Sequence, residues 1–195
     1  EGLIVEMKNL KKSFGTNHVL KDINFTLNKG ENVVVLGKSG TGKSVLIKCV
    51  VKLIDPDSGE LKIFGRDILK LKDEELSEVR SKIGFLFQSG ALYDSMTVRE
   101  NLEFPLRRKM RSAKDSEINA LVKEVLENVG LGNTSEKMPS ELSGGMRKRI
   151  SLARTLILKP ELMLYDEPTT GLDPITSQEI SELILEIQKK YKTSS

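Results

Sequence analysis

The sequence of 195 residues predicts an α/β fold with a small antiparallel β-layer and an inserted group of helices. Strand-like and helix-like segments alternate along the chain, as they do in α/β proteins. Three short apolar runs have the composition of strands buried in a sheet. From residue 89 to about residue 142 the patterns are helical and no strand pattern occurs.

The β-layer is predicted by alternation of apolar and polar residues. LIVEMKNLKKSFG and HVLKDINFTLNKGE both alternate and both break at glycines, and GELKIFGRDI repeats the pattern further along. A period of two residues is typical of antiparallel strands with one solvent-exposed face. We therefore expect an antiparallel sheet at the edge of the domain.

The core strands are predicted by continuous apolar runs. ENVVVLG is the first, and we expect it to be buried on both faces of a parallel sheet. The helix KSVLIKCVVKLIDP follows it and should stop at Asp55 and Pro56. SKIGFLFQ and PELMLYDEP are the second and third predicted core strands.

The inserted helices are predicted from TVRENLEFPLRRKM and SAKDSEINALVKEVLENVGL. The second segment has an apolar stripe at helical spacing, made of Ile118, Leu121, Val122, Val125, Leu126 and Val129. GMRKRISLARTLILKP and DPITSQEISELILEIQKKYK are two further helices. Asp173 is the expected N-cap of the last one, with Pro174 in its first turn.

Composition narrows the class of protein. Thirty-one basic and 28 acidic residues leave a net charge of +3, which argues against a dedicated nucleic-acid binder. No apolar run approaches the roughly 18 residues that span a bilayer, and the N-terminal residues lack a signal-peptide pattern, so we expect a cytoplasmic protein. Cys49 is the only cysteine and should be a small buried thiol.

A phosphate-binding loop is predicted by GKSGTGKS, which fits the pattern G-x-x-x-x-G-K-S between a strand and a helix. Glycines allow the backbone to approach a triphosphate, and the helix N-terminus adds N–H groups. Lys43 should neutralise the β- and γ-phosphates, and the Ser44 hydroxyl should bind Mg²⁺. The candidate ATP-binding residues here are Gly37, Lys38, Ser39, Gly40, Thr41, Gly42, Lys43, Ser44 and Val45.

Two carboxylates follow the third core strand, at the end where α/β sheets place their sites. Asp166 should hold Mg²⁺ through its water shell, and Glu167 should polarise the attacking water. Gln88 ends the second core strand and could contact Mg²⁺ or the water. The catalytic candidates are thus Glu167, Gln88 and Lys43, and the Mg²⁺ candidates are Ser44, Gln88 and Asp166.

Together these segments resemble the nucleotide-binding subunits of ABC transporters. GKSGTGKS, Gln88, LSGGM, LMLYDE and GLD occur in that family's order and cover nearly the whole chain. The resemblance implies an ATPase with a P-loop NTPase (RecA-like) core, an antiparallel β-subdomain and an α-helical subdomain. Residues 1–195 then form one ABC ATPase domain, with residues 1–88 and 146–195 in the β-subdomain and core and residues 89–145 in the helical subdomain.

The resemblance also implies an ATP site shared between two head-to-tail copies of the chain. Ser143, Gly144 and Gly145 of the signature loop would contact the ATP of the partner copy, although Met146 replaces the family's usual glutamine. Asp173 would communicate across the same dimer. Phe14 would stack on adenine with Val19 beside it; the alternative is that Phe14 belongs to a local core.

One part of the family pattern is absent, the switch histidine on the strand after the last helix. The only histidine is His18, on a different segment. The simplest interpretation is that the C-terminal end of the domain is missing, so we expect these 195 residues to hydrolyse ATP poorly.

FLFQSGALYDSMTVRENLEFPLR and MPSELSGGMRKR resemble the ATPases of Mla-type systems, which move phospholipids between bacterial membranes. This implies a peripheral protein on the inner face of the membrane, attached through a permease that contacts the region around Ser89 to Phe104. Tyr93, Met96 and Val98 are the candidate contacts, and the alternative is that they are core residues.

Other functions remain open. The chain could serve another transporter branch, such as lipoprotein release, cell division or solute import. An ABC ATPase of DNA repair or of the ribosome fits less well, because the chain has one cassette and no sustained heptads. A nucleotide sensor without turnover would not need Glu167. The basic cluster Arg147, Lys148 and Arg149 is interpreted as a solvated face or as local acid pairs, with no site assigned.

Overall fold

A computed structural model of the chain describes residues 2–38, 40–88 and 90–195. The chain divides into two compact units. Unit 1 comprises Glu1–Ile83, Glu161–Asp166 and Lys192–Ser195, and unit 2 comprises Gly84–Pro160 and Glu167–Tyr191.

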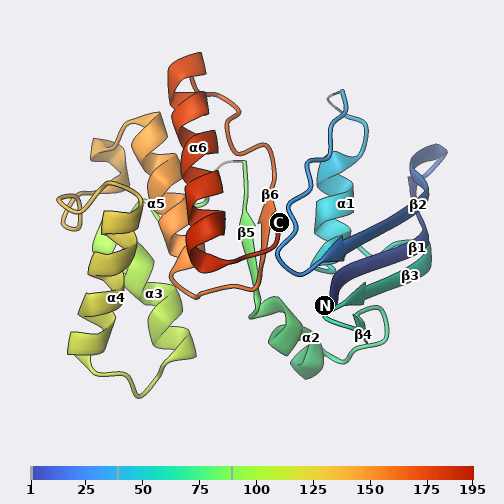
Figure 1. Ribbon diagram of the computed structural model, residues 1–195, viewed down its shortest axis with the longest axis horizontal. Helices are drawn as coiled ribbons and strands as arrows, with labels where there is room; N and C mark the ends of the chain where they lie inside the picture. The colour runs from blue at the N-terminus through green and yellow to red at the C-terminus, as the bar shows by residue number, and fades with distance from the viewer. Residues whose placement is uncertain (1, 39, 89) are drawn as a thin grey trace. The chain divides into compact units, whose positions relative to one another are not determined.

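Unit 1 contains the predicted antiparallel sheet (Figure 1). Its strands are β1 (Leu3–Phe14), β2 (Asn17–Asn28), β3 (Ser58–Ile63) and β4 (Arg66–Asp67), in the order β2-β1-β3-β4. A tight hairpin pairs Phe14 with Asn17, and Val5 lies opposite Ile63 on the other neighbour. The alternation of apolar and polar residues therefore predicted this sheet correctly.

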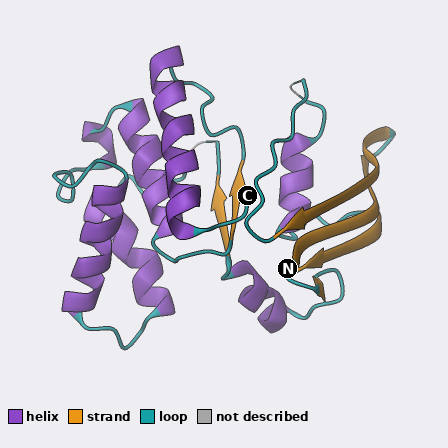
Figure 2. Cartoon of the chain, in the orientation of Figure 1, coloured by secondary structure: helices purple, strands orange, loops and turns teal. Residues whose placement is uncertain are grey.

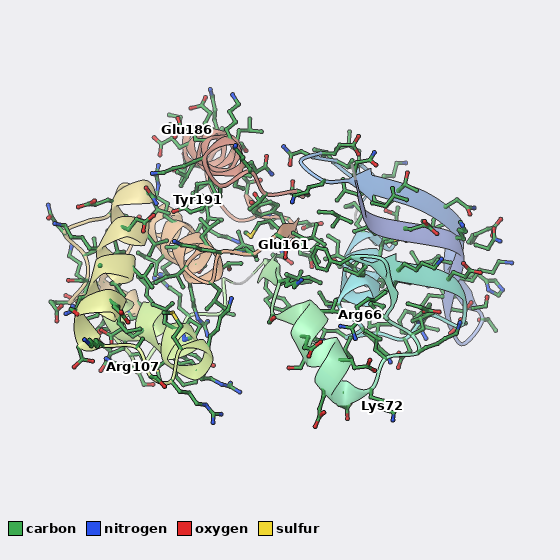
Figure 3. The ribbon with its side chains drawn as sticks, turned by 60° about the horizontal axis from the view of Figure 1, so that its bottom comes forward. Arg66, Lys72, Arg107, Glu161, Glu186 and Tyr191 are labelled. Carbon is green, nitrogen blue, oxygen red and sulfur yellow. The ribbon has the colours of Figure 1, made fainter. Side chains whose placement is uncertain are left out.

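The core of unit 1 is closed by α1 (Lys43–Val50) and α2 (Asp73–Arg80). Cys49 is fully buried as expected, and burial raises the pKa of its thiol to about 11. The sequence patterns did not predict α2, whose residues Glu75 and Glu78 both accept hydrogen bonds from Arg66. The side chain of Arg66 is labelled in Figure 3. The buried core side chains are Ile4, Val5, Met7, Leu10, Leu20, Leu27, Cys49, Val50, Leu61, Ile63, Ile68, Leu76, Val79 and Leu162.

The first helix ends earlier than predicted, at Val50 instead of near Asp55. Lys52 adopts a left-handed conformation with φ of 52°, and its N–H donates to the Cys49 carbonyl. The next amide, of Leu53, donates to the Lys48 carbonyl. This pair of bonds is a Schellman motif, which ends a helix by satisfying its last carbonyl groups.

The prediction that ENVVVLG is a buried strand is wrong for this structure. Residues 31–38 have no regular secondary structure, and Val34 and Leu36 are 78% and 87% exposed. A strand forms only where a neighbouring strand pairs with its backbone N–H and C=O groups. Within unit 1 the backbone of Glu31 and Val33 bonds to Ser195, and no strand of the described residues continues this ladder beside Val34 to Leu36.

The C-terminal residues join the same part of unit 1. Ser194 forms a parallel bridge with Leu162 at the start of β6 (Leu162–Tyr165), and its buried hydroxyl accepts a hydrogen bond from the Gly30 N–H. Leu162 also donates its N–H to the carbonyl of Lys82, just before β5 (Ile83–Leu86). Both short strands were predicted.

Unit 2 is mainly helical (Figure 2). It contains α3 (Val98–Lys109), α4 (Asp115–Asn128), the short 3₁₀ helix η1 (Pro139–Glu141), α5 (Gly144–Leu156) and α6 (Pro174–Tyr191). No strand occurs in the described residues from 90 to 142, as predicted. The stripe of α4 is buried except at Leu121, which is only partly covered.

In the described part of the chain, no helix combines the length and apolarity needed to cross a membrane.

Candidate functional site

The predicted phosphate loop lies in unit 1, directly before α1. Gly40 and Gly42 have φ of 79° and 101°, a region that L side chains rarely adopt. A Cβ on Gly42 would also lie 2.6 Å from Val19 Cγ1, so Val19 packs directly against the loop. The first turn of α1 has no acidic residue, which leaves its positive N-terminus available to an anion. Ser39 lies outside the described residues.

Lys43 is held by the loop itself. Its ammonium donates to the carbonyl of Gly37 at 2.7 Å and to that of Lys38 at 2.9 Å. Thr41 Oγ1 donates to the same Lys38 carbonyl at 2.8 Å. The positive charge predicted to neutralise phosphate is therefore centred over the loop, where a phosphate would compete for it.

The structure brings together the two residues predicted to bind Mg²⁺ from distant parts of the sequence. Ser44 Oγ donates to Asp166 Oδ1 at 2.7 Å, across 122 residues. Asp166 is buried at the end of β6, and Val45 packs against the core of unit 1. Hydroxyl and carboxylate oxygens are ligands that Mg²⁺ prefers, so these residues fit the ion.

Phe14 and Val19 lie on the β1–β2 hairpin, near the strand ends. The ring of Phe14 is 50% exposed, which disfavours the alternative that it belongs to a local core. Lys12 Nζ lies over the ring at 5.3 Å from its centroid, within cation–π range. Asp57 accepts hydrogen bonds from Lys12 Nζ and from the Ser13 N–H, and both contacts lower the pKa of its carboxyl.

His18 sits in this hairpin, where its Nδ1 lies 2.8 Å from Ser13 Oγ. The histidine is part of the β-layer, as its position in the sequence indicated.

Gln88 and Glu167 belong to unit 2. Glu167 has φ of 47°, and its carboxylate accepts a hydrogen bond from Thr170 Oγ1 at 3.1 Å. A glutamate in the left-handed region is uncommon, and strained positions of this kind are frequent at functional sites. Gln88 is exposed two residues after the end of β5. Their action on Mg²⁺ and water stays a prediction.

The signature loop forms the start of α5. Ser143 is the N-cap, and its hydroxyl accepts a hydrogen bond from the Met146 N–H at 3.2 Å. Gly145 packs so closely that a Cβ there would lie 2.6 Å from Thr176 Cγ2, and Gly144 lies beside Leu172. The first turn of α5 has no acidic residue. The loop thus has the features of an anion site.

Asp173 caps α6, as predicted. Its carboxylate accepts hydrogen bonds from the Thr176 N–H at 3.0 Å and from the Thr176 hydroxyl at 2.6 Å. These bonds lower the pKa of the carboxyl. Its second expected role, contact with a partner copy, stays a prediction.

The interpretation of the basic cluster is partly wrong. Arg149 does form an acid pair, with Glu179 at 3.1 Å. Lys148, however, is only 8% exposed and donates to the main-chain carbonyl of Gln88. Burial lowers the pKa of its ammonium. The sequence signal was present but weak: Lys148, Ser151 and Arg154 lie three residues apart, on one side of a helix.

The expected permease-contact residues differ in exposure. Tyr93 is 42% exposed, whereas Val98 is completely buried at the start of α3 and Met96 is partly covered. Val98 is therefore a core residue, because the first turn of α3 packs inward. The ring of Tyr93 meets that of Phe104 edge-on, with centroids 5.3 Å apart. Ser89 lies outside the described residues.

Comparison with known families gives one match that covers most of the chain. A family model described as ABC transporter matches residues 20–170. This range contains the phosphate loop, Gln88, the signature loop and the carboxylates after β6.

Three curated relatives illustrate the range of functions. Probable ribonucleotide transport ATP-binding protein mkl of Mycobacterium leprae is 46% identical over 186 residues, 95% of this chain and 53% of its own length. Protein TRIGALACTOSYLDIACYLGLYCEROL 3, chloroplastic, of Arabidopsis thaliana is 46% identical over 190 residues, 93% and 54% of the two lengths. Intermembrane phospholipid transport system ATP-binding protein MlaF of Haemophilus influenzae is 38% identical over 192 residues, 98% and 72%.

The chain thus spans about half the length of the first two relatives. The expectation that Mla-type ATPases are its nearest relatives is not supported, because the mycobacterial protein shares 46% of residues and MlaF 38%.

Two solved structures share the fold. CbiO1 from Clostridium perfringens, described as part of the ABC transporter complex cbiONQ, aligns with a TM-score of 0.90 and 29% identity over 100% of this chain and 77% of its own. The ATP-binding cassette MJ0796, described as a dimer in a post-hydrolysis state bound to ADP and Pi, aligns with a TM-score of 0.85 and 34% identity over 97% and 85%. The predicted P-loop NTPase fold with an antiparallel β-subdomain is confirmed.

Proposed function

The chain belongs to the ABC transporter family as an ATP-binding domain, and from this premise we propose that it binds and hydrolyses ATP to drive a transporter. The hydrogen bond between Ser44 and Asp166 carries the proposal. It joins the phosphate loop to the acidic end of β6 within unit 1, and it gathers oxygen ligands for Mg²⁺ beside a glycine loop suited to phosphates.

Each residue then has a defined task. Lys43 and the loop N–H groups would bind the phosphates, and Ser44, Asp166 and Gln88 would hold Mg²⁺. When bound there, Mg²⁺ would neutralise negative charge on the phosphate oxygens. Glu167 orients the attacking water and accepts its proton.

Hydrolysis is tested by Glu167→Gln in the full-length protein, with Glu186→Gln as the matched control. Glu186 is an exposed glutamate on α6 (Figure 3), so its substitution makes the same chemical change away from the site. We expect Glu167→Gln to retain ATP binding and to lose turnover by about 10²-fold or more, because general-base catalysis contributes 10²- to 10⁴-fold. Unchanged turnover in Glu167→Gln would remove this residue from catalysis.

The partner for turnover is a second copy of the chain, arranged head to tail. Ser143, Gly144 and Gly145 at the start of α5 would bind the γ-phosphate held by the other copy, with Asp173 beside them. Three features support this assignment: Ser143 is the N-cap of α5, the first turn of α5 has no acidic residue, and Gly145 packs closely on Thr176. MJ0796, with which the chain shares 34% identity, is described as a dimer.

The second partner is an integral-membrane permease that contacts residues 89–104, which would place the protein peripherally on the inner face of the membrane. Tyr93 supports a contact surface there, because it is 42% exposed. Its ring packs edge-on against Phe104, and the Arg154 guanidinium lies 4.6 Å from the ring centroid. Aromatic and arginine side chains are enriched in protein interfaces. Val98 does not take part, since it is buried.

For the cargo we favour a phospholipid or related lipid. The segment after Gln88 and the methionine of the signature loop support this branch, and two relatives carry lipid names, the chloroplast protein and MlaF. The rival is solute transport, since a relative of 46% identity is named for ribonucleotide transport.

Purification of the tagged full-length protein from gently solubilised membranes, followed by mass spectrometry, separates these alternatives. A permease together with a lipid-binding extracytoplasmic subunit supports lipid transport. A solute-binding protein favours import of a solute, and DNA-repair or ribosomal proteins would overturn the transporter assignment.

A further inference from the structure

Side chains on one side of α5 form hydrogen bonds to the main chain of the segment that follows β5. The helix and this segment both belong to unit 2. Lys148 Nζ donates to the carbonyl of Gln88, and the Arg154 guanidinium donates to the carbonyl of Ala91. Between them Ser151 is buried against Gly90, where a Cβ would lie 2.6 Å from Ser151 Oγ. Three α5 residues spaced three apart thus contact Gln88, Gly90 and Ala91.

The hydrogen bonds from Lys148 and Arg154 can fix the position of the main chain that they contact. Ammonium and guanidinium groups form charge-assisted hydrogen bonds, which are about twice as strong as neutral ones. Lys148 is only 8% exposed, so its bond to Gln88 is largely shielded from water. Because the acceptor at Gln88 is its main-chain carbonyl, the bond from Lys148 fixes the backbone of Gln88. The side-chain amide of Gln88 is not used by this bond.

Arg154 also contacts an exposed residue of the same segment, Tyr93. Its guanidinium lies 4.6 Å from the centroid of the Tyr93 ring, within cation–π range. The next part of the segment is fixed from α3, where the buried Asn101 accepts from the Tyr93 N–H and donates to the carbonyls of Tyr93 and Met96. Gln88, Gly90 and Ala91 are therefore held from α5, and Tyr93 and Met96 are held from α3.

We propose that Lys148 and Arg154 are positioning residues that fasten the Gln88 loop to the signature helix α5. The inference rests on the proposed function, in which Gln88 acts on the chain's own Mg²⁺ and water while Ser143 contacts the partner's ATP. A movement of α5 on engaging that ATP is then transmitted through Lys148 to Gln88. Arg154 transmits the same movement to the surface at Tyr93.

The test compares four variants of the full-length protein. Lys148→Met removes the charge but keeps a long unbranched side chain, and Lys148→Arg restores a donor. Arg154→Met removes the second contact. Arg149→Met is the matched control, because it removes a charge from the same helix but contacts Glu179 and the Val129 carbonyl instead of the loop.

We expect Lys148→Met to lower kcat by about 10- to 100-fold, because misplacement by 1 Å can cost 10²-fold. KM for ATP should change less than about threefold, because the phosphate loop lies in unit 1 and is untouched. Arg154→Met should lower kcat in the same way, Lys148→Arg should recover most of it, and Arg149→Met should retain it. Equal losses in Lys148→Met and Arg149→Met would overturn the proposal.

Amide hydrogen exchange supplies a readout that does not depend on turnover. In Lys148→Met, peptides covering residues 86–96 should exchange faster than in Arg149→Met, while peptides from α4 should be unchanged. Unchanged exchange of the loop overturns the inference whatever the kinetics. If the unsubstituted protein hydrolyses no ATP, the proposed function fails, and faster exchange would still support the fastening of the Gln88 loop to α5.

Discussion

Replacement of Gly42 by alanine tests how tightly the phosphate loop is packed on the β-layer. Two costs arise from the structure. With φ of 101°, an alanine pays roughly 1–2 kcal/mol for the left-handed conformation. Its Cβ would also lie 2.6 Å from Val19 Cγ1 and 3.3 Å from the Val19 carbonyl oxygen, and overpacking of this kind costs about 1–3 kcal/mol. The total is about 2–5 kcal/mol of unfolding free energy.

Gly40 provides the matched control. It has φ of 79°, so alanine there meets the conformational cost, but no atom of the described residues beyond its own chain neighbours lies within 4 Å of its Cβ position. Gly40→Ala should therefore lose only about 1–2 kcal/mol. The difference between the two variants isolates the contact with Val19.

Urea unfolding followed by circular dichroism measures both variants, and fluorescence titration measures ATP affinity. We expect Gly42→Ala to be the less stable by about 1–3 kcal/mol, with unchanged m. When both glycine variants also carry Val19→Ala, the difference in stability between them should be smaller, because the atom closest to the added Cβ is gone. Equal losses for Gly40→Ala and Gly42→Ala would refute the role of the Val19 contact.

Two further outcomes are expected. Thr97→Ala should lower the unfolding free energy by about 0.5–2 kcal/mol, since Thr97 Oγ1 and the Glu100 carboxylate form the capping box of α3. Thr97→Ser keeps the hydroxyl and should retain most of this stability. Equal losses for the two variants in urea unfolding would contradict the role of the capping box. Asp57→Asn should flatten the acid side of the stability profile measured from about pH 6 to about pH 3. Lys12 and the Ser13 N–H hold the pKa of Asp57 below its ordinary value. The stabilisation from Asp57 is therefore full above the ordinary pKa and is lost as pH falls through the lowered pKa. The same stability profile in Asp57→Asn as in the unsubstituted protein would contradict this.

Local patterns predicted the elements whose stability is decided locally. The hairpin of β1 and β2 follows from alternation and a turn, and α4 follows from one apolar stripe that is buried almost as expected. The cap of α6 was readable because Asp173 and Thr176 are only three residues apart. The phosphate loop was predicted because its glycines, lysine and serine are contiguous in sequence.

The failures arise where distant residues decide the outcome. Residues 31–38 have the composition of a buried strand, but a parallel strand depends on neighbours far away in sequence. Lys148 looks like a surface residue until the fold places the Gln88 carbonyl against it. Val98 was equally ambiguous, because position at a helix start does not say which side faces the core.

The geometry of Lys43 indicates how ATP would be accommodated. The ammonium bonds to the carbonyls of Gly37 and Lys38, which are neutral acceptors. A phosphate oxygen carries negative charge, so the ammonium gains an attraction between opposite charges in addition to the hydrogen bond. Phosphate binding therefore replaces the two carbonyl contacts with stronger ones, while the bond between Ser44 and Asp166 lies outside this exchange. The carbonyls of Gly37 and Lys38 must lose their bonds to Lys43 on binding. By contrast, α1 and β6, which position Ser44 and Asp166, are built into the core of unit 1.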